Sequence, residues 1–278
     1  SLFQSDLAKF KTTASAVCFD MDSTLIKEEE TLDAYSSFFG LDLGGSAITE
    51  KAMGGQIGFR KKALALRLEM LRPTKAQYER FLNEFTPTLS DGVEQLVTVL
   101  RGYGVDLYIV TGGFVEVAKR VAQRLNIPNK NVFANRILFS ADGCYEGFDK
   151  SQSGASPIGK AGVCQQSGAS PIGKAGVCQL LKERNSYKLL VMVGDNSYKL
   201  LVMVGDGGTD MEARPPADLF VGYGGNQVRE KVRLGSDWFV RDFRTLTDAI
   251  EEQVREKVRL GSDWFVRDFR TLTDAIEE

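Results

Sequence analysis

Two aspartates near the start of the chain have a spacing that suits chemistry on a phosphate group. Asp20 directly follows Ala14–Phe19, an apolar run that predicts a buried strand, and Asp22 comes soon after it. Ligands of open α/β sheets bind beyond the carboxyl ends of the strands, where Asp20 would stand. A carboxylate there can attack phosphorus and form an aspartyl-phosphate. Asp22, two positions further along an extended segment, would face the same side and act as general acid and base. The alternative reading is a turn in which Asp and Ser are capping residues.

A second segment combines a hydroxyl group with two glycines. Thr111, Gly112 and Gly113 follow the apolar run Val105–Val110, and we expect a helix to open at the glycines and run through Leu125. Backbone N–H groups at the start of a helix bind phosphate oxygens well, and the threonine hydroxyl would add to them. The sequence therefore predicts a phosphate-binding turn at this place.

A third segment supplies two more carboxylates. Asp206 and Asp210 come after the apolar run Val202–Val204 and are separated by glycines and a threonine. Mg²⁺ prefers oxygen ligands, usually one or two carboxylates together with a substrate phosphate. Asp20 and Asp206 are the candidate side-chain ligands. The alternative is a glycine-rich turn closed by a capping aspartate.

A lysine near the start of a predicted helix is the last of these candidate site residues. Lys160 and Lys174 occupy equivalent positions in two identical copies of one segment. Either amine could neutralise the charge of a transferred phosphoryl group. We favour Lys174, because it is contiguous with the helix predicted over residues 175–183.

The order of these segments resembles that of the haloacid dehalogenase superfamily of phosphatases. Further matches, to the branch of that superfamily that hydrolyses O-phospho-L-serine, are Ala52–Gly55, Asn131–Arg136, Asp210–Ala213 and Pro215–Asp218. The resemblance covers nearly all of the chain. It implies Mg²⁺-dependent hydrolysis of phosphoserine to L-serine and phosphate through an aspartyl-phosphate, the last step of serine biosynthesis.

The same resemblance implies a fold, and the pattern of elements agrees with it. Helices and strands alternate in the second half of the chain, which is typical of a doubly wound, Rossmann-like parallel sheet in an α/β protein. Val132–Leu138 and Cys144–Phe148 predict a hairpin. Residues 28–85 have helical spacing and no convincing strand. We therefore expect a small helical cap domain over 28–85, inserted after the first strand of a core made by 1–27 and 86–278.

The resemblance adds detail to the expected metal site. It implies the backbone carbonyl of Asp22 as a third ligand beside the carboxylates of Asp20 and Asp206. It also implies that Asp210 supports the water shell of the metal.

Residues that would select the substrate are implied in the same way. Glu29 matches the family's partner for the substrate ammonium, with its neighbours Glu28 and Glu30 as alternatives. Arg67 matches the partner for the substrate carboxylate, where a forked guanidinium suits the geometry. The residues implied to line or rim the pocket are Met53, Gly54, Phe59, Asn135, Thr209 and Arg229.

Composition excludes several classes of protein and one kind of chemistry. The formal net charge of −2 gives no electrostatic case for nucleic acid or an anionic membrane. No apolar run approaches the roughly 18 residues that a membrane span needs, and Ser1–Lys11 lacks the features of a signal peptide. The four cysteines have no paired or metal-like spacing, so we expect reduced thiols in the cytoplasm. With no histidine, acid–base chemistry must use other groups. Sheet edges or cap helices could form a homodimer.

Three segments of the chain occur twice, without a single difference between the copies. They are residues 152–165 and 166–179, 185–195 and 196–206, and 227–252 and 253–278. A solenoid requires one period and at least three units, so these repeats do not predict one. A second copy of a central strand without a crossover would also break the rules of parallel sheets. We interpret the duplications as an artefact and expect a natural chain of about 227 residues, the 278 less one copy of each segment.

Two other functions stay open on the sequence alone. One is a phosphatase of the same superfamily for another small phosphate ester, and the other is a protein that binds phosphate or metal without catalysis. Replacing Glu29 or Arg67 should raise KM for phosphoserine far more than for p-nitrophenyl phosphate if phosphoserine is the substrate. The Asp20→Asn substitution should leave a non-catalytic function intact.

Overall fold

The computed structural model describes residues 14–41, 67–149, 173–184 and 200–259. Four of the site residues predicted from the sequence lie outside these ranges: Met53, Gly54, Phe59 and Lys160. The chain divides into two compact units. The first contains the chain up to Asp20, Ser90–Tyr108 and the chain from Lys174 on, and the second contains Met21–Leu89 and Ile109–Gly173.

Four parallel strands form the centre of the first unit. In their order within the sheet they are β1 (Ala14–Phe19), β5 (Leu200–Gly205), β6 (Leu219–Tyr223) and β7 (Trp238–Val240). The described side chains of β1, β5 and β6 are buried, because helices cover both faces of a parallel sheet. In the register of β1 and β5, Phe19 is the partner of Val204. The two strands therefore end side by side.

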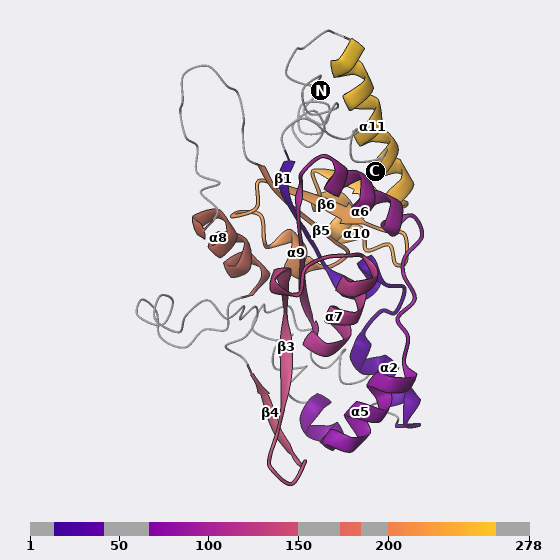
Figure 1. Ribbon diagram of the computed structural model, residues 1–278, viewed down its shortest axis with the longest axis vertical. Helices are drawn as coiled ribbons and strands as arrows, with labels where there is room; N and C mark the ends of the chain where they lie inside the picture. Colours follow the sequence, from indigo (N-terminus) through magenta and orange to yellow (C-terminus); the bar gives the residue numbers. More distant parts are fainter. Residues whose placement is uncertain (1–13, 42–66, 150–172, 185–199, 260–278) are drawn as a thin grey trace, which may run out of the picture. The chain divides into compact units, whose positions relative to one another are not determined.

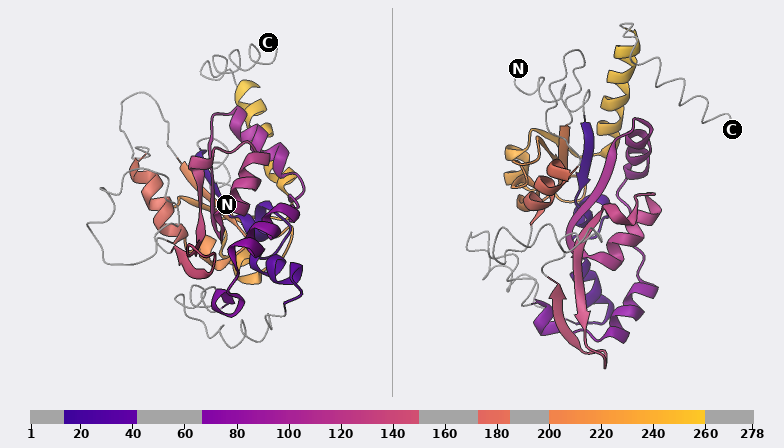
Figure 2. Two further views of the ribbon diagram at one scale, coloured as in Figure 1. Left: turned by 60° about the horizontal axis from the view of Figure 1, so that its bottom comes forward. Right: turned by 60° about the vertical axis from the view of Figure 1, so that its left-hand side comes forward.

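Helices lie on both sides of the strands of the first unit. They are α6 (Val93–Gly102), α8 (Lys174–Arg184), α9 (Gly208–Met211), α10 (Glu230–Gly235) and α11 (Phe243–Arg259). Both views of Figure 2 place α8 on one side of β1 and β5, and α6 with α11 on the other. Phe243 of α11 anchors the second layer, because its ring stacks on Tyr223 at 4.2 Å and meets Phe19 edge-on at 6.4 Å.

Strand β2 (Asp106–Phe114) starts in the first unit and ends in the second. There it pairs in parallel with β3 (Val132–Phe139), which pairs antiparallel with β4 (Tyr145–Asp149) in the predicted hairpin (Figure 1). The strand order along the whole sheet is β4-β3-β2-β1-β5-β6-β7. The doubly wound α/β fold expected from the sequence is therefore confirmed.

Within the described residues of the second unit, the helices are α2 (Thr31–Phe38), α5 (Lys75–Glu84) and α7 (Val115–Arg124), with short turns η1 (Met21–Leu25) and η2 (Asn129–Asn131), and residues 67–71 are also helical. Aromatic side chains pack between α2 and α5. The ring centroid of Tyr35 lies 5.3 Å from that of Phe81 and 6.3 Å from that of Tyr78. Both helices lie within the residues expected to form a cap, but the boundaries of that cap stay a prediction, because 42–66 are outside the described residues.

The helix after Thr111 begins later than the sequence predicts. Gly112 and Gly113 belong to the end of β2, and α7 starts at Val115. The strand continues because Phe114 still has a partner, Asn135, on β3. The glycines are therefore placed in a strand end, and the prediction that they open the helix was wrong by two residues.

None of the helices in the described part of the chain combines the length and the apolar character that a bilayer crossing requires.

Candidate active site

Three aspartates meet at the carboxyl ends of two neighbouring strands in the first unit. Asp20 follows β1 directly, Asp206 follows β5 directly, and Asp210 lies on α9. One carboxylate oxygen from each lies within 4.8 Å of the others. All three side chains are buried, with exposed fractions of 7 %, 3 % and 0 %. The parallel register explains the meeting, because the backbone N–H of Asp20 donates to the carbonyl of Val204 at 2.9 Å and aligns the two strand ends.

Glycine at position 205 makes room for Asp210. A Cβ atom at Gly205 would lie 2.2 Å from Cγ of Asp210, which no real contact allows. The backbone N–H of Gly207 donates to Oδ2 of Asp210 at 3.0 Å. The Gly-Asp-Gly sequence at the end of β5 therefore folds the carboxylate of Asp210 back under the strand end.

Lys174, the first residue of α8, bridges two of these carboxylates. Its Nζ atom lies 2.7 Å from Oδ2 of Asp20 and 2.5 Å from Oδ1 of Asp210. Burial alone would lower the pKa of Lys174, but the charges of Asp20 and Asp210 outweigh it and raise that pKa above its usual value. The lysine therefore stays positively charged at neutral pH.

Arg229 supplies the second positive charge of the cluster. Its guanidinium forms an ion pair with Oδ2 of Asp206 and lies 3.3 Å from the backbone carbonyl oxygen of the same residue. The resemblance implied six residues that line or rim the pocket. Among those that the structure describes, Arg229 is the one that contacts this cluster. Thr209 lies on the short helix α9 and is half-buried.

The cluster suits a divalent cation. Among the described residues, three buried carboxyl groups face two cationic side chains, so one negative charge is in excess when all three are ionised. Burial, then the charge of Asp20, raises the pKa of Asp206, and the same two causes raise the pKa of Asp210 to about 8. Hard cations such as Mg²⁺ and Ca²⁺ take oxygen ligands, and a bound cation would relieve this repulsion. Asp20, Asp206 and Asp210 therefore fit a metal on the chemistry of their donor atoms.

Asp22 lies in the second unit and is held by a hydroxyl group. Oγ1 of Thr31 donates a hydrogen bond to Oδ1 of Asp22 at 2.5 Å. The neighbouring Ser23 has a φ of +55°, a left-handed conformation that is uncommon for residues other than glycine. This turn bends the chain right after the aspartate pair. The sequence reasoning missed Thr31, whose only sequence signal is its place at the start of a helix.

The other oxygen of Asp22 lies against the glycine turn. A Cβ atom at Gly113 would lie 2.8 Å from Oδ2 of Asp22 and 3.3 Å from Oγ1 of Thr111. The backbone N–H of Gly113 donates to that Thr111 oxygen at 2.9 Å, and the Asn135 amide donates to the carbonyl of Gly112 at 2.7 Å. Asp22, Thr111, Gly112, Gly113 and Asn135 are therefore gathered at one place in the second unit.

Arg67 is buried and held by two carboxylates of α2 and its cap position. Its two terminal nitrogens form ion pairs with Glu30 and Asp33, and its exposed fraction is 7 %. Its Nε–H is buried without a hydrogen-bond partner among the described residues.

The three consecutive glutamates near α2 have different surroundings. Glu28 accepts a hydrogen bond from the backbone N–H of Thr88 at 3.0 Å, and Glu30 binds Arg67. Glu29 is exposed and forms no hydrogen bond or ion pair with the other described residues. Glu29 is therefore the one of these three glutamates whose carboxylate has no hydrogen bond or ion pair with the described residues. It is also the residue of the three that the sequence favoured.

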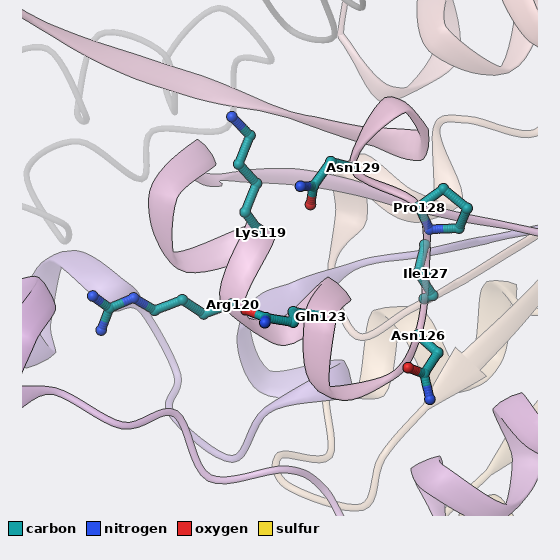
Figure 3. Close-up of a pocket in the computed structure, with 7 residues that line it drawn as sticks. All are labelled: Lys119, Arg120, Gln123, Asn126, Ile127, Pro128 and Asn129. Atoms are coloured by element: carbon teal, nitrogen blue, oxygen red, sulfur yellow. The ribbon is translucent and has the colours of Figure 1, made fainter.

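A shallow hollow of about 520 Å³ lies elsewhere in the second unit. Figure 3 shows its lining at the end of α7 and the following loop, where Lys119 and Arg120 extend in different directions. The hollow contains none of the residues that the sequence nominated, and its polar side chains do not converge on a common point.

Comparisons with known proteins agree on one family. The family model described as haloacid dehalogenase-like hydrolase matches residues 14–218. A bovine protein named phosphoserine phosphatase is 41 % identical over 248 residues, which cover 89 % of this chain and 98 % of the relative. The chloroplastic phosphoserine phosphatase of Arabidopsis thaliana is 36 % identical over 86 % of this chain and 72 % of its own length.

A solved structure extends the likeness to three dimensions. The phosphoserine phosphohydrolase-like protein from Francisella tularensis superposes with a TM-score of 0.63 at 28 % identity. The aligned residues cover 84 % of this chain and 98 % of that protein.

Proposed function

The chain belongs to the haloacid dehalogenase-like hydrolases, and from this membership we propose that it hydrolyses O-phospho-L-serine to L-serine and inorganic phosphate. The observation that carries the proposal is the cluster of Asp20, Asp206, Asp210 and Lys174 at the carboxyl ends of β1 and β5. Relatives that align over nearly all of the chain carry the name of that activity. The reaction would be the last step of serine biosynthesis.

Asp20 is the proposed nucleophile. It attacks the phosphorus of the ester in line with the leaving serine oxygen, and the P–O bond to serine breaks as the aspartyl-phosphate forms. Lys174 supports this role because its ammonium lies 2.7 Å from Oδ2 of Asp20 and places a positive charge where the phosphoryl oxygens must come.

Mg²⁺ is the proposed cofactor. When bound, it supplies positive charge that offsets the charge of the phosphoryl group. The side chains of Asp20 and Asp206 and the backbone carbonyl of Asp22 would hold it, with Asp210 supporting its water shell. The excess of negative charge in the cluster supports this assignment.

Asp22 is the proposed general acid and base. It protonates the serine oxygen as that oxygen leaves, and it then takes a proton from the water that hydrolyses the aspartyl-phosphate. Thr111, Gly112 and Gly113 would bind phosphate oxygens, and their place next to Asp22 within the second unit supports a joint role. Thr209 is a further proposed residue at the rim of the substrate pocket.

Glu29 and Arg67 are proposed to recognise the amino and carboxyl groups of serine. Glu29 is supported by its exposed carboxylate, which has no hydrogen-bond or ion-pair partner among the described residues, and Arg67 by its buried guanidinium with an unpartnered Nε–H. Further residues proposed around this pocket are Met53, Gly54, Phe59, Asn135 and Arg229.

The test is phosphate release from phosphoserine with and without Mg²⁺, measured on wild type and Asp20→Asn. We expect release that depends on Mg²⁺ and on Asp20. Glu29→Gln and Arg67→Ala should raise KM for phosphoserine and leave KM for p-nitrophenyl phosphate nearly unchanged. Equal effects on both esters would indicate a phosphatase for another small substrate.

A further inference from the structure

The residue that opens α2, Thr31, is engaged with Asp22 by a short hydrogen bond. The distance of 2.5 Å from Oγ1 of Thr31 to Oδ1 of Asp22 is typical of a hydroxyl bound to a charged carboxylate. Such bonds are roughly twice as strong as bonds between neutral groups. Thr31 is 1 % exposed, so water does not compete for its hydroxyl group.

The hydroxyl of Thr31 does not stabilise its own helix. Threonine near a helix start usually caps it by accepting a hydrogen bond from a backbone N–H group. Here the cap position of α2 is Glu30, whose side chain makes no capping hydrogen bond, and Thr31 is one residue inside the helix. The threonine is therefore placed to serve Asp22.

Neighbouring residues hold the first turn of α2 in place. Glu30 and Asp33, on either side of Thr31, both bind the buried guanidinium of Arg67. The helix start therefore has little freedom to rotate, and the hydroxyl of Thr31 is a fixed donor to Asp22.

The two oxygens of Asp22 have different surroundings as a result. Oδ1 accepts the hydrogen bond from Thr31, and Oδ2 lies on the side of Gly113 and Thr111. An oxygen that accepts a short hydrogen bond is a poor place for a proton. When Asp22 is a carboxylic acid, its hydrogen therefore belongs on Oδ2, which lies beside the glycine turn.

We propose that Thr31 is a positioning residue for Asp22, whose hydroxyl turns the carboxylate so that Oδ2 delivers the proton to the leaving alkoxide. The inference rests on the proposed function. In the step concerned, the hydrogen on Oδ2 moves to the serine oxygen as the P–O bond breaks, and Asp22 remains as a carboxylate that accepts a proton from the attacking water in the second step.

The experiment measures leaving-group release in the first turnover of the Mg²⁺-loaded full chain, with phosphoserine and with p-nitrophenyl phosphate. An alkoxide needs a proton as it leaves, whereas p-nitrophenolate does not, so only phosphoserine should depend on the position of Asp22. Thr31→Val removes the hydroxyl, and Thr31→Ser keeps it. Ser36→Ala is the matched control, because Ser36 lies on the same helix and its hydroxyl donates to the carbonyl of Asp33.

We expect Thr31→Val to slow serine release by about tenfold or more, with an unchanged KM and with p-nitrophenol release within about twofold of wild type. Thr31→Ser and Ser36→Ala should release serine within about threefold of wild type. The size of the p-nitrophenol burst counts the active sites, so partial unfolding of a variant is corrected for.

The proposal is overturned if Thr31→Val releases serine at the wild-type rate, slows both esters equally, or is not rescued by Thr31→Ser. A wild type that cleaves p-nitrophenyl phosphate but not phosphoserine overturns the proposed substrate alone. The Thr31 comparison then uses phosphoethanolamine, another alkyl ester, with the same expected outcomes. A wild type that cleaves none of these esters overturns both proposals.

Discussion

Nζ of Lys174 lies 2.7 Å from Oδ2 of Asp20, which joins the start of α8 to the end of β1. The two residues are separated by more than half of the chain. The same Nζ atom lies 2.5 Å from Oδ1 of Asp210, whose side chain is fully buried. This lysine is therefore the cation that the two carboxylates share.

Replacing Lys174 by Met should remove most of the activity. The charge that faces the phosphoryl group is lost, and a preorganised charge of this kind contributes about 10²-fold or more to kcat. Phosphate release under saturating phosphoserine and Mg²⁺ measures the effect. Lys182→Met is the matched control, because Lys182 lies on the same helix and pairs with Asp218. Wild-type kcat in Lys174→Met would contradict the role given to the lysine.

Replacing Asp20 by Asn should abolish turnover while the fold persists. The amide cannot form an acyl phosphate, and the substitution also removes one negative charge from a crowded cluster. We expect no phosphate release above background and no covalent phosphate on the acid-quenched protein, whereas wild type carries one during turnover. Intact mass after rapid quenching detects the adduct. An adduct on Asp20→Asn would place the nucleophile at another residue.

The metal-free protein should become less stable as pH rises. Burial and the charge of Asp20 raise the pKa of Asp210 to about 8 from an ordinary value of 3.8. Between these values the folded state keeps a proton that the unfolded state has lost, so the free energy of unfolding falls as pH increases. The pKa of Asp206 is also raised, so this residue contributes to the fall in stability in the same direction. Thermal unfolding from pH 5 to pH 8 in EDTA should show a falling Tm.

Saturating Mg²⁺ should flatten that pH dependence. A bound divalent cation neutralises the carboxylates, so the folded state no longer needs the extra proton. Asp210→Asn without metal should likewise lose part of the slope. An unchanged slope in both cases would mean that other groups cause it.

The sequence predicted the parts of the site that lie at strand ends. The positions of Asp20 and Asp206 at the ends of neighbouring strands were predicted correctly, because each follows an apolar run and parallel neighbours end at the same edge of a sheet. The boundary between β2 and α7 was predicted wrongly, because pairing of Phe114 with Asn135 on another strand extends β2 past the glycines. The intrinsic preferences of the local residues give no information about pairing with a strand that is distant in the sequence.

Contacts between side chains that are distant in the sequence could not be predicted from the sequence either. The hydrogen bond from Thr31 to Asp22 and the ion pairs of Arg67 with Glu30 and Asp33 depend on how the helix start packs. The choice among Glu28, Glu29 and Glu30 is of the same kind. Three identical side chains in a row gain different neighbours only when the chain folds.

The carboxylates that hold Arg67 should compete with the carboxylate of the substrate. Glu30 and Asp33 both bind the guanidinium, and burial raises the pKa of Asp33 despite its attraction to Arg67. Glu30→Gln and Asp33→Asn should therefore lower KM for phosphoserine by about threefold each, since roughly 0.7 kcal/mol is ordinary for a partly exposed ion pair. KM for phosphoethanolamine, which has no carboxylate, should not change.

Glu84→Gln is the control for these substitutions, because Glu84 forms an exposed pair with Arg80 on α5. A rise in KM for phosphoserine in the Glu30 or Asp33 variants would mean that these carboxylates orient Arg67 for the substrate and do not compete with it.

A chain without one copy of each duplication should fold and keep its activity. Lys174, Asp206 and Arg229 lie in copies that the structure describes, whereas Lys160 and Asp195, the equivalents of the first two, lie outside it. Removing residues 185–195 would shorten the connection from α8 to β5 to four residues, and connections of about two to six residues are usual in α/β units.

We therefore expect a chain lacking 152–165, 185–195 and 253–278 to match the full chain in kcat within about twofold. Its Tm should be close to that of the full chain: the two shorter loops cost less entropy on folding, about 0.6 kcal/mol per doubling of loop length, whereas the deletion of 253–278 shortens α11 at its C-terminal end. Steady-state kinetics and calorimetry on the two chains make the comparison. Loss of activity on deletion would mean that the second copies are part of the working fold. An intact mass near 30.7 kDa for the natural protein would show that they are native.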